Sequence, residues 1–339
     1  MKLKNVLFKL DKSGLGKFTE MLHLQYEVFG PVSSEAGHVF EVLSKGQVPD
    51  LEYGNTVFSS KRFFLPRSQA VLEYSLSSGK VEDLLSTPSK KRFLFGIRQC
   101  ELHAINLNDQ FMLEGVVDPY YAALRKNTLI AVLQCKRKAA DHCFCSSLGF
   151  DSVPEGFDLL FQDEGTFFVL QAGSVKGEEL IVKAGLSKYA GEVSKPDIRC
   201  DLVLEESAAL SMKHSYDHPL WDETAKKCIS CGACTIVCPT CLCFDVEDQN
   251  SLGLESGVRV RRWDSCQYME FGRVGGDFCF RRNRSSRVKH RVFHKYAYSY
   301  EFFGRPSCVG CGRCFPVCLT GINHVKVLNE IARTPLETK

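Results

Sequence analysis

The sequence predicts a protein of the α+β or α/β class, in which an N-terminal α/β domain precedes a helical, cysteine-rich domain. Two observations support this prediction. Segments 93–97 and 128–133 are short apolar runs typical of buried strands, and a helical pattern over 101–113 lies between them. Such a strand, helix, strand unit gives neighbouring parallel strands. Farther along, two four-cysteine runs define the C-terminal part of the chain.

The two cysteine runs share the spacing C-x2-C-x2-C-x3-C, from Cys228 to Cys238 and from Cys308 to Cys318. This is the spacing of bacterial-type ferredoxins, in which three thiolates hold one [4Fe-4S] cube and the fourth binds the other. The sequence therefore predicts a ferredoxin-like domain with two [4Fe-4S] clusters. The predicted ligands of the first cluster are Cys228, Cys231, Cys234 and Cys318, and those of the second are Cys308, Cys311, Cys314 and Cys238.

Zinc and disulfides are the alternatives for these cysteines. C-x2-C pairs also make four-thiolate zinc sites, but those usually come as two pairs separated by a long gap. Two matching runs of four cysteines therefore favour cubes.

The predicted domain boundaries follow the same patterns. Residues 1–200 form the α/β domain, which also contains a helix over 18–29 and a hairpin over 157–172. A polar, helical connector covers 201–226. The dicluster domain covers 227–325, with a basic insertion at 244–305 between the cysteine runs, and residues 326–339 form a tail.

Four cysteines of the N-terminal domain are predicted to meet at one edge of its sheet. Cys100 and Cys135 come just after the two buried strands, and the carboxyl ends of parallel strands share an edge. Cys143 and Cys145 follow in a polar loop, where burial has no obvious cause. We expect these four residues to bind a third [4Fe-4S] cluster. The alternative is that they pack as small buried apolar residues, as free cysteines often do.

Composition excludes several classes of protein. No apolar run approaches the roughly 20 residues of a membrane-spanning helix, and the apolar residues near the start are too few for a signal peptide, which predicts a cytoplasmic protein without a membrane span. The 17 cysteines cluster in metal-ligand spacings, so we expect reduced thiols in an anaerobic cytosol rather than disulfides.

Positive charge is concentrated in the insertion. The net charge is only +3, yet residues 259–305 hold 12 Lys and Arg against four Asp and Glu. Basic and aromatic residues alternate there, as on surfaces that bind single-stranded nucleic acid, but no nucleic-acid-binding motif accompanies them and we expect no such partner. Two interpretations stay open. The cations balance the negative charge of the cubes, or they dock an acidic partner subunit.

Five cysteines have no assigned role, namely Cys200, Cys241, Cys243, Cys266 and Cys279. Cys241, Cys243 and Cys266 stand in stretches that look like sequence motifs, which indicates that these three cysteines lie close to the clusters. They supply a further ligand or pack as small apolar residues, and packing is the favoured interpretation.

Several motifs together resemble a known family of iron-sulfur subunits. They are Gly96-x-Arg98-x-Cys100-x-Leu102-His103-Ala104, Asp118-Pro119-Tyr120-Tyr121, Cys143-Phe144-Cys145, Cys238-Pro-Thr-Cys-Leu-Cys243-Phe-Asp245, Trp263-Asp-Ser-Cys266 and His294-Lys295. The family includes the beta subunit of archaeal sulfhydrogenase and an iron-sulfur subunit of anaerobic sulfite reductase. Similar subunits occur in flavin oxidoreductase complexes attached to heterodisulfide reductase. The resemblance covers about residues 92–325.

The resemblance implies a non-catalytic electron-transfer subunit of a hetero-oligomeric oxidoreductase complex. In such complexes a companion subunit with FAD and a [2Fe-2S] centre reacts with NAD(P)H, and the iron-sulfur subunit passes single electrons to a catalytic partner of the hydrogenase, sulfite reductase or heterodisulfide reductase type. The implied cluster ligands are the eight cysteines of the two runs. The alternative is an oxidoreductase with its own substrate or flavin site in the N-terminal domain, although no dinucleotide loop, P-loop or catalytic triad is visible.

Overall fold

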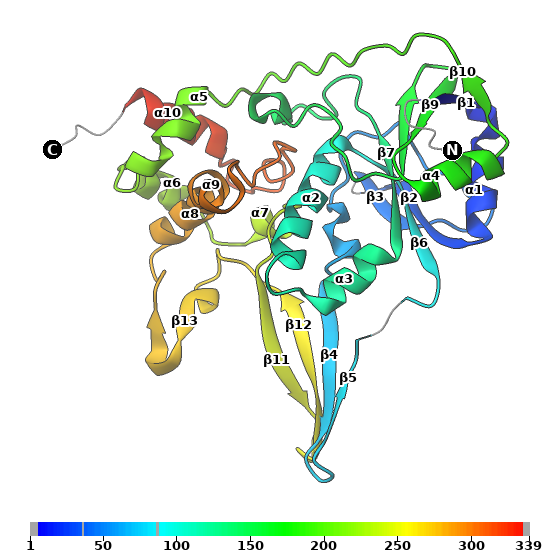
Figure 1. Ribbon diagram of the computed structural model, residues 1–339. Helices are drawn as coiled ribbons and strands as arrows, with labels where there is room; N and C mark the ends of the chain where they lie inside the picture. The colour runs from blue at the N-terminus through cyan, green and yellow to red at the C-terminus, as the bar shows by residue number, and fades with distance from the viewer. Residues whose placement is uncertain (1–5, 36, 86–87, 335–339) are drawn as a thin grey trace.

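The protein is described by a computed structural model over residues 6–334, except residues 36, 86 and 87 (Figure 1). Its N-terminal part is built on an eight-stranded sheet with the strand order β10-β1-β9-β8-β7-β6-β2-β3. The four central strands β8, β7, β6 and β2 are parallel, and the outer ones are antiparallel. The strands are β1 (Leu7–Asp11), β2 (Tyr26–Ser34), β3 (Gly37–Val42), β6 (Lys91–Ile97), β7 (Thr128–Leu133), β8 (Leu159–Asp163), β9 (Phe167–Ala172) and β10 (Ser187–Tyr189).

Helices cover both faces of this sheet. The helices are α1 (Leu15–His23), α2 (Gln99–Leu113), α3 (Pro119–Lys126) and α4 (Val175–Lys183). Figure 1 shows α2 and α3 on the face turned toward the C-terminal helices, and α1 and α4 on the other. In α1, Phe18 packs edge-on against Phe95 and Phe161, with ring centroids 6.1 and 5.9 Å apart. The predicted α/β architecture, with its parallel strands around α2 and its hairpin of β8 and β9, is confirmed.

The predicted helix over 18–29 is wrong beyond His23. Tyr26 begins β2, and residues 26–29 pair with β6 in parallel register. The aromatic and β-branched residues there suit a buried strand, so pairing with the sheet outweighs the helical spacing. Pro31 lies in β2 but past the residues that pair with β6, where its missing N–H costs no bond in that ladder.

A second, four-stranded sheet joins distant parts of the chain. Its strand order is β11-β12-β4-β5, so a hairpin of the N-terminal domain pairs with a hairpin of the predicted insertion. Figure 1 shows this sheet projecting from the body of the molecule. The insertion is therefore partly structured by residues far before it. The strands are β4 (Ser68–Ser75), β5 (Lys80–Asp83), β11 (Phe244–Asn250) and β12 (Ser256–Trp263).

The C-terminal part is helical and has its own core around Trp221, Tyr296 and Leu328. The predicted connector contains two of its helices. Residues 326–333, expected to be a tail, instead continue α10, because Leu328 and Ile331 are buried; residues 335–339 lie outside the described residues. The helices are α5 (Glu206–Ser211), α6 (Leu220–Lys227), α7 (Ala233–Ile236), α8 (Arg284–Phe293), the π-helical turn η7 (His294–Tyr298), α9 (Ser299–Phe303) and α10 (His324–Arg333).

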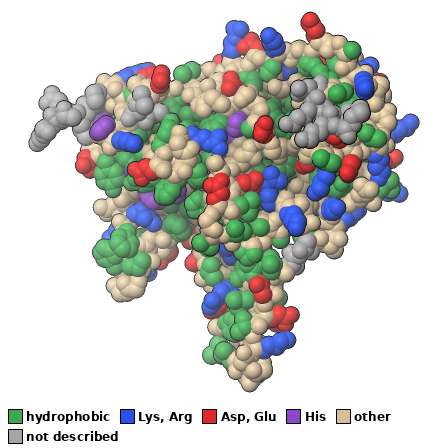
Figure 2. Space-filling model, viewed as in Figure 1, with side chains coloured by type: hydrophobic (Ala, Val, Ile, Leu, Met, Phe, Trp, Pro, Cys, Tyr) green, Lys and Arg blue, Asp and Glu red, His purple; other side chains and the backbone are tan. Residues whose placement is uncertain are grey.

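A small hairpin projects from the C-terminal part, formed by β13 (Arg273–Val274) and β14 (Phe278–Cys279). Figure 2 shows hydrophobic side chains gathered on it, and Phe278 and Phe280 are both exposed. Among the described helices, none is both long and apolar enough to span a bilayer.

Candidate metal centres

The first cysteine run leaves the end of α6 and curls tightly. Cys228 follows the last residue of α6, and Gly232 adopts a left-handed backbone (φ +73°) just before α7. The backbone N–H of Ser230 donates to the Cys228 sulfur at 3.4 Å. One cavity of about 70 Å³ is lined by the four cysteines predicted for the first cluster, Cys228, Cys231, Cys234 and Cys318.

The second run forms a neighbouring site. A cavity of about 20 Å³ is lined by the four cysteines predicted for the second cluster, Cys238, Cys308, Cys311 and Cys314. Cys314 lines both cavities, so the two sites share a wall. Burial raises the pKa of Cys308 to about 11, so this group holds its proton until a metal replaces it.

Arg291 of α8 is a buried cation between the two sites. It lines both cavities, and its Nη2 donates to the carbonyl of Cys234 at 3.2 Å. Burial disfavours its charge, but the sulfurs of Cys234 and Cys314 outweigh burial and raise the pKa of Arg291. The guanidinium therefore stays charged where an all-thiolate cluster would place negative charge.

Lys295 of η7 is a second buried cation beside the second site. Its Nζ donates to the carbonyl and the hydroxyl of Thr240 at 2.9 and 2.8 Å. Burial lowers its pKa, but Cys238 and Cys241 act in the opposite direction, and the net pKa is raised. The charge-balancing interpretation of the basic insertion thus has two buried residues in its support.

His324 also lines both cavities. Its Nε2 lies 2.9 Å from the Tyr296 hydroxyl, and its ring stacks on Phe315. Burial, with Arg291 nearby, lowers the pKa of His324 to about 3, so the imidazole is neutral at physiological pH. We assign it a packing and hydrogen-bonding role.

The donor set fits [4Fe-4S] clusters. Two groups of four soft thiols face buried cations, as an anionic cube requires. The Nε atom of Arg291, which lines both cavities, is buried without a partner, which leaves an N–H donor for cluster sulfur. No three His, Cys, Asp or Glu side chains in the described part of the chain are arranged to hold a single metal ion. A cube differs in that its four thiolates bind four separate irons.

We expect the Arg291→Gln variant to shift the midpoint potential of the clusters to lower values. The reduced cluster carries one more negative charge, and a nearby cation stabilises it. A shift on the order of 60 mV would correspond to a tenfold change in the one-electron equilibrium. Redox titration followed by electron paramagnetic resonance measures it. The control is Lys289→Gln on the same helix, since Lys289 lies over the ring of Tyr216 instead. Equal potentials in the two variants would contradict the expected role of Arg291.

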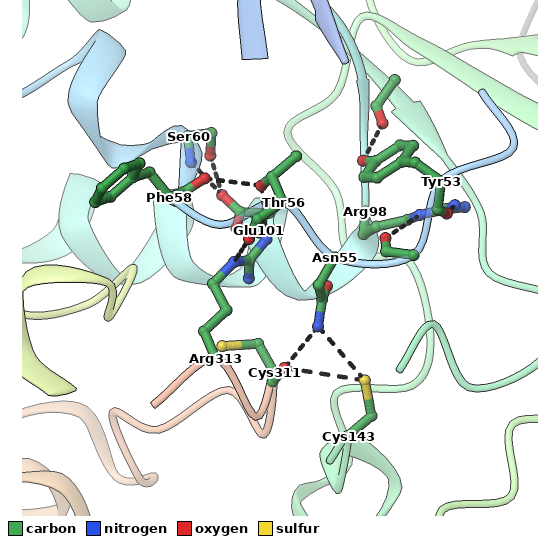
Figure 3. Close-up of polar contacts among 12 residues, drawn as sticks. Tyr53, Asn55, Thr56, Phe58, Ser60, Arg98, Glu101, Cys143, Cys311 and Arg313 are labelled. Atoms are coloured by element: carbon green, nitrogen blue, oxygen red, sulfur yellow. Dashed lines mark hydrogen bonds and ion pairs between the residues drawn. The ribbon is translucent and has the colours of Figure 1, made fainter. Parts of the chain in front are cut away.

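The second cysteine loop is pressed against the N-terminal domain (Figure 3). The N–H of Phe144 donates to the carbonyl of Gly310 at 2.9 Å. Asn55 Nδ2 donates to the carbonyl of Cys311 at 2.7 Å and lies 3.7 Å from the Cys143 sulfur. Gly310 has a left-handed backbone (φ +65°), and a Cβ there would lie 2.5 Å from Cys145 Cα. The two loops therefore meet at backbone distance.

A buried ion pair fastens the same junction. Arg313 Nη2 lies 2.5 Å from Glu101 Oε1, and both side chains are almost fully buried. Arg313 also donates to the carbonyl and hydroxyl of Thr56 at 3.0 and 3.2 Å, and Glu101 accepts from the N–H of Ser60 at 2.7 Å. Figure 3 shows these groups pointing toward one another between α2 and the second cysteine loop.

The four N-terminal cysteines predicted for a third cluster are all buried. Cys100 lies in the first turn of α2, and Cys135 follows β7, where its N–H donates to Gln99 Oε1 at 2.8 Å. Cys143 and Cys145 are buried although their loop is polar, because the second cysteine loop covers them. The sequence could not show this cover, since it comes from residues far along the chain.

Cys241, Cys243 and Cys266 lie together beside the second site. They line a cavity of about 280 Å³ that also contains Arg291 and Lys295. Cys266, close to Cys243, lowers the pKa of the Cys243 thiol. Cys279 is elsewhere, with its sulfur 3.3 Å from the carbonyl of Met269.

The functional residues that sequence reasoning missed are Asn55, Glu101 and Arg313. Asn55 and Glu101 lie far in sequence from the cysteine loop that they contact. Arg313 stands within the second run itself, between two predicted ligands, and its place there is the one signal that could have indicated it.

Comparison with known proteins gives two matches. The family model described as "4Fe-4S dicluster domain" matches residues 227–322. The "Sulfhydrogenase 2 subunit beta" of Pyrococcus furiosus is 33% identical over 336 residues, which cover 95% of this chain and 97% of that protein. No solved structure matches the chain.

Proposed function

Because the chain belongs to the family of sulfhydrogenase beta subunits, we propose that it relays single electrons through two [4Fe-4S] clusters. The first cluster would be held by Cys228, Cys231, Cys234 and Cys318, and the second by Cys238, Cys308, Cys311 and Cys314. The proposed donor or acceptor on one side is a companion subunit with FAD and a [2Fe-2S] centre that reacts with NAD(P)H. On the other side is a catalytic partner of the hydrogenase, sulfite reductase or heterodisulfide reductase type.

The observation that supports this proposal best is the wall shared by the two cysteine-lined cavities. Cys314, Arg291 and His324 line both. When bound, [4Fe-4S] clusters supply one-electron oxidation and reduction. The chain's residues would hold the thiolates in place, and Arg291 and Lys295 would balance their charge. The proposed setting is a reducing cytoplasm, where such thiols stay free of disulfides.

Iron analysis of the anaerobically purified chain tests this assignment. The two cubes require about eight irons and about eight acid-labile sulfides. Cys234→Ala should lose about four irons and the paramagnetic interaction between two reduced cubes. Cys279→Ala is the matched control, since Cys279 lines none of the cavities at the cysteine runs. Full iron content and unchanged spectra in Cys234→Ala would argue against the ligand set.

An oxidoreductase with its own flavin or substrate site is the second candidate function. One observation favours it, a hollow of about 890 Å³ at the edge of the sheet that is lined by Arg98, Cys135 and Lys136. Such a volume lies within the range of small-molecule sites. A flavin absorption spectrum in the isolated chain, or turnover of NAD(P)H without partner subunits, would support this candidate, and the absence of both would remove it.

A further inference from the structure

Cys200, which has no role in the proposed relay, is held against the N-terminal cysteine loop. It lies on a long extended segment that runs from β10 to α5 across the molecule (Figure 1). The N–H of Asp197 donates to the carbonyl of Lys136 at 2.8 Å, and Asp201 forms an ion pair with Lys138. Contacts on both sides of Cys200 therefore fix this segment beside the loop that follows Cys135.

A third contact holds the segment that contains Cys200 beside the loop that contains Cys145. The N–H of Leu204 donates to the hydroxyl of Ser147 at 3.2 Å, two residues after Cys145. Cys200 is half-buried and packs against the cluster of buried side chains that includes Cys145. Besides burial, Cys200 raises the pKa of the Cys145 thiol, an effect that two thiols exert on each other only when they lie close together. The loop and the crossing segment thus bring the two thiols close together.

Cys135 and Cys143 also lie near the Cys145 thiol. Burial raises the pKa of the Cys145 thiol most, and Cys200, Cys143 and Cys135 raise it further, in that order. Burial raises the pKa of Cys143 to about 11, and Cys311, Cys135 and Cys200 raise it further, in that order. Four thiols from three separate segments therefore lie near one another at the carboxyl edge of the parallel strands.

Cys100 occupies a different position. Burial raises the pKa of Cys100. The groups with the next largest effects on this pKa are Arg313, Cys311 and Glu101, followed by Cys135. Cys143, Cys145 and Cys200 are not among the groups with the largest effects on the pKa of Cys100. Cys100 belongs to one buried cluster that contains both Cys145 of the N-terminal loop and Cys311 of the second cysteine run. It lies between the N-terminal thiols and the second site.

We propose that Cys135, Cys143, Cys145 and Cys200 hold a third [4Fe-4S] cluster, and that Cys100 separates this cluster from the second one without binding either. Assembly takes up two ferrous ions, two ferric ions and four sulfide ions, and each of the four thiols releases one proton. The ligand site stands independently of the partners in the proposed relay, but its use as an electron carrier rests on that function.

The third site adjoins the second. The Cys143 sulfur lies 3.9 Å from the carbonyl of Cys311, a predicted ligand of the second cluster, and Asn55 contacts both residues (Figure 3). Arg98, beside Cys135, and Arg313, beside Cys311, supply positive charge at the two ends of this junction. An electron at the third cluster would therefore have the second cluster as its nearest neighbour on this side.

Iron content and spectra of cysteine variants of the full chain test the proposal. The unaltered chain, purified anaerobically or reconstituted with ferrous iron, ferric iron and sulfide, should contain about twelve irons. Cys200→Ala should lose about four of them and one set of paramagnetic signals after reduction with dithionite. Cys100→Ala and Cys279→Ala should keep all three clusters. Alanine is chosen because a serine oxygen can still bind iron.

Loss of the third cluster from Cys100→Ala but not from Cys200→Ala would overturn the ligand set. A full chain with about eight irons, unchanged in Cys200→Ala, would overturn the third site while leaving the two-cluster relay standing. Where Cys200→Ala gives too little soluble protein, the Cys143→Ala/Cys145→Ala variant serves instead and should retain the interacting pair of cubes. Failure of the proposed relay is distinguishable, because it would appear as loss of that interacting pair from the unaltered chain.

Discussion

Glu101→Gln should lower the free energy of unfolding by about 3–5 kcal/mol, because it leaves the buried charge of Arg313 without its partner. The side chains of both residues are at most 2% exposed, and glutamine keeps the shape of the site while removing the negative charge. Ser60 can still donate to the remaining side-chain oxygen. The expected change is therefore electrostatic and not a matter of packing. The midpoint of anaerobic urea unfolding, compared at equal iron content, measures it.

The matched control is Asp248→Asn, which breaks the pair between Asp248 and Arg259 on the projecting sheet. The two side chains lie 2.8 Å apart but are 37% and 46% exposed. Exposed pairs contribute about 1 kcal/mol or less, because water screens both charges. Equal shifts in the two variants would show that the Glu101–Arg313 pair does not fasten the cysteine loop to the N-terminal domain.

Gly312→Ala should disrupt the second metal site. Gly312 lies between Cys311 and Arg313 with a left-handed backbone (φ +71°), and a Cβ there would lie 2.2 Å from the carbonyl oxygen of His142. A left-handed residue with a Cβ costs roughly 1–2 kcal/mol by itself. The clash adds to this cost, since two backbone segments must move apart. We expect a loss of about four irons per chain in addition to lower stability.

Gly321→Ala separates these two contributions. Gly321 has the same left-handed backbone (φ +67°) and also lies close to a predicted ligand, Cys318, but a Cβ there would meet nothing within 4 Å. This variant should show the backbone cost alone and retain its iron. A Gly312→Ala protein that matched it in iron content and stability would contradict the close approach of the two loops.

The grouping of the eight run cysteines around two cavities could be predicted because their spacing is local. In each run the first three cysteines lie within seven residues, and small residues between them allow the curl that one cavity needs. Cys200 could not be predicted in the same way. Its place depends on Asp197, Asp201 and Leu204, which hold an extended segment with no periodic pattern against a distant loop.

The basic insertion shows a second limit of sequence reasoning. Its cations look alike in sequence but have different environments. Arg291 and Lys295 are buried beside the metal sites, whereas Arg259 and Arg262 pair with Asp248 and Glu247 across the β11–β12 hairpin. The positions of these residues in the sequence do not distinguish a cation that faces a cavity from one that faces water. The missed ion pair of Arg313 has the same cause, since Glu101 is distant in sequence.

The sheet shared by β4, β5, β11 and β12 has a consequence for biosynthesis. The hairpin of β4 and β5 leaves the ribosome early, but its edge stays unpaired until the chain has been made as far as Trp263. An open strand edge can pair with other nascent chains, and contacts between distant residues form slowly. The β4–β5 hairpin of the N-terminal domain therefore completes its pairing only after the segment between the cysteine runs has been synthesised. Premature termination within this segment would leave an aggregation-prone fragment.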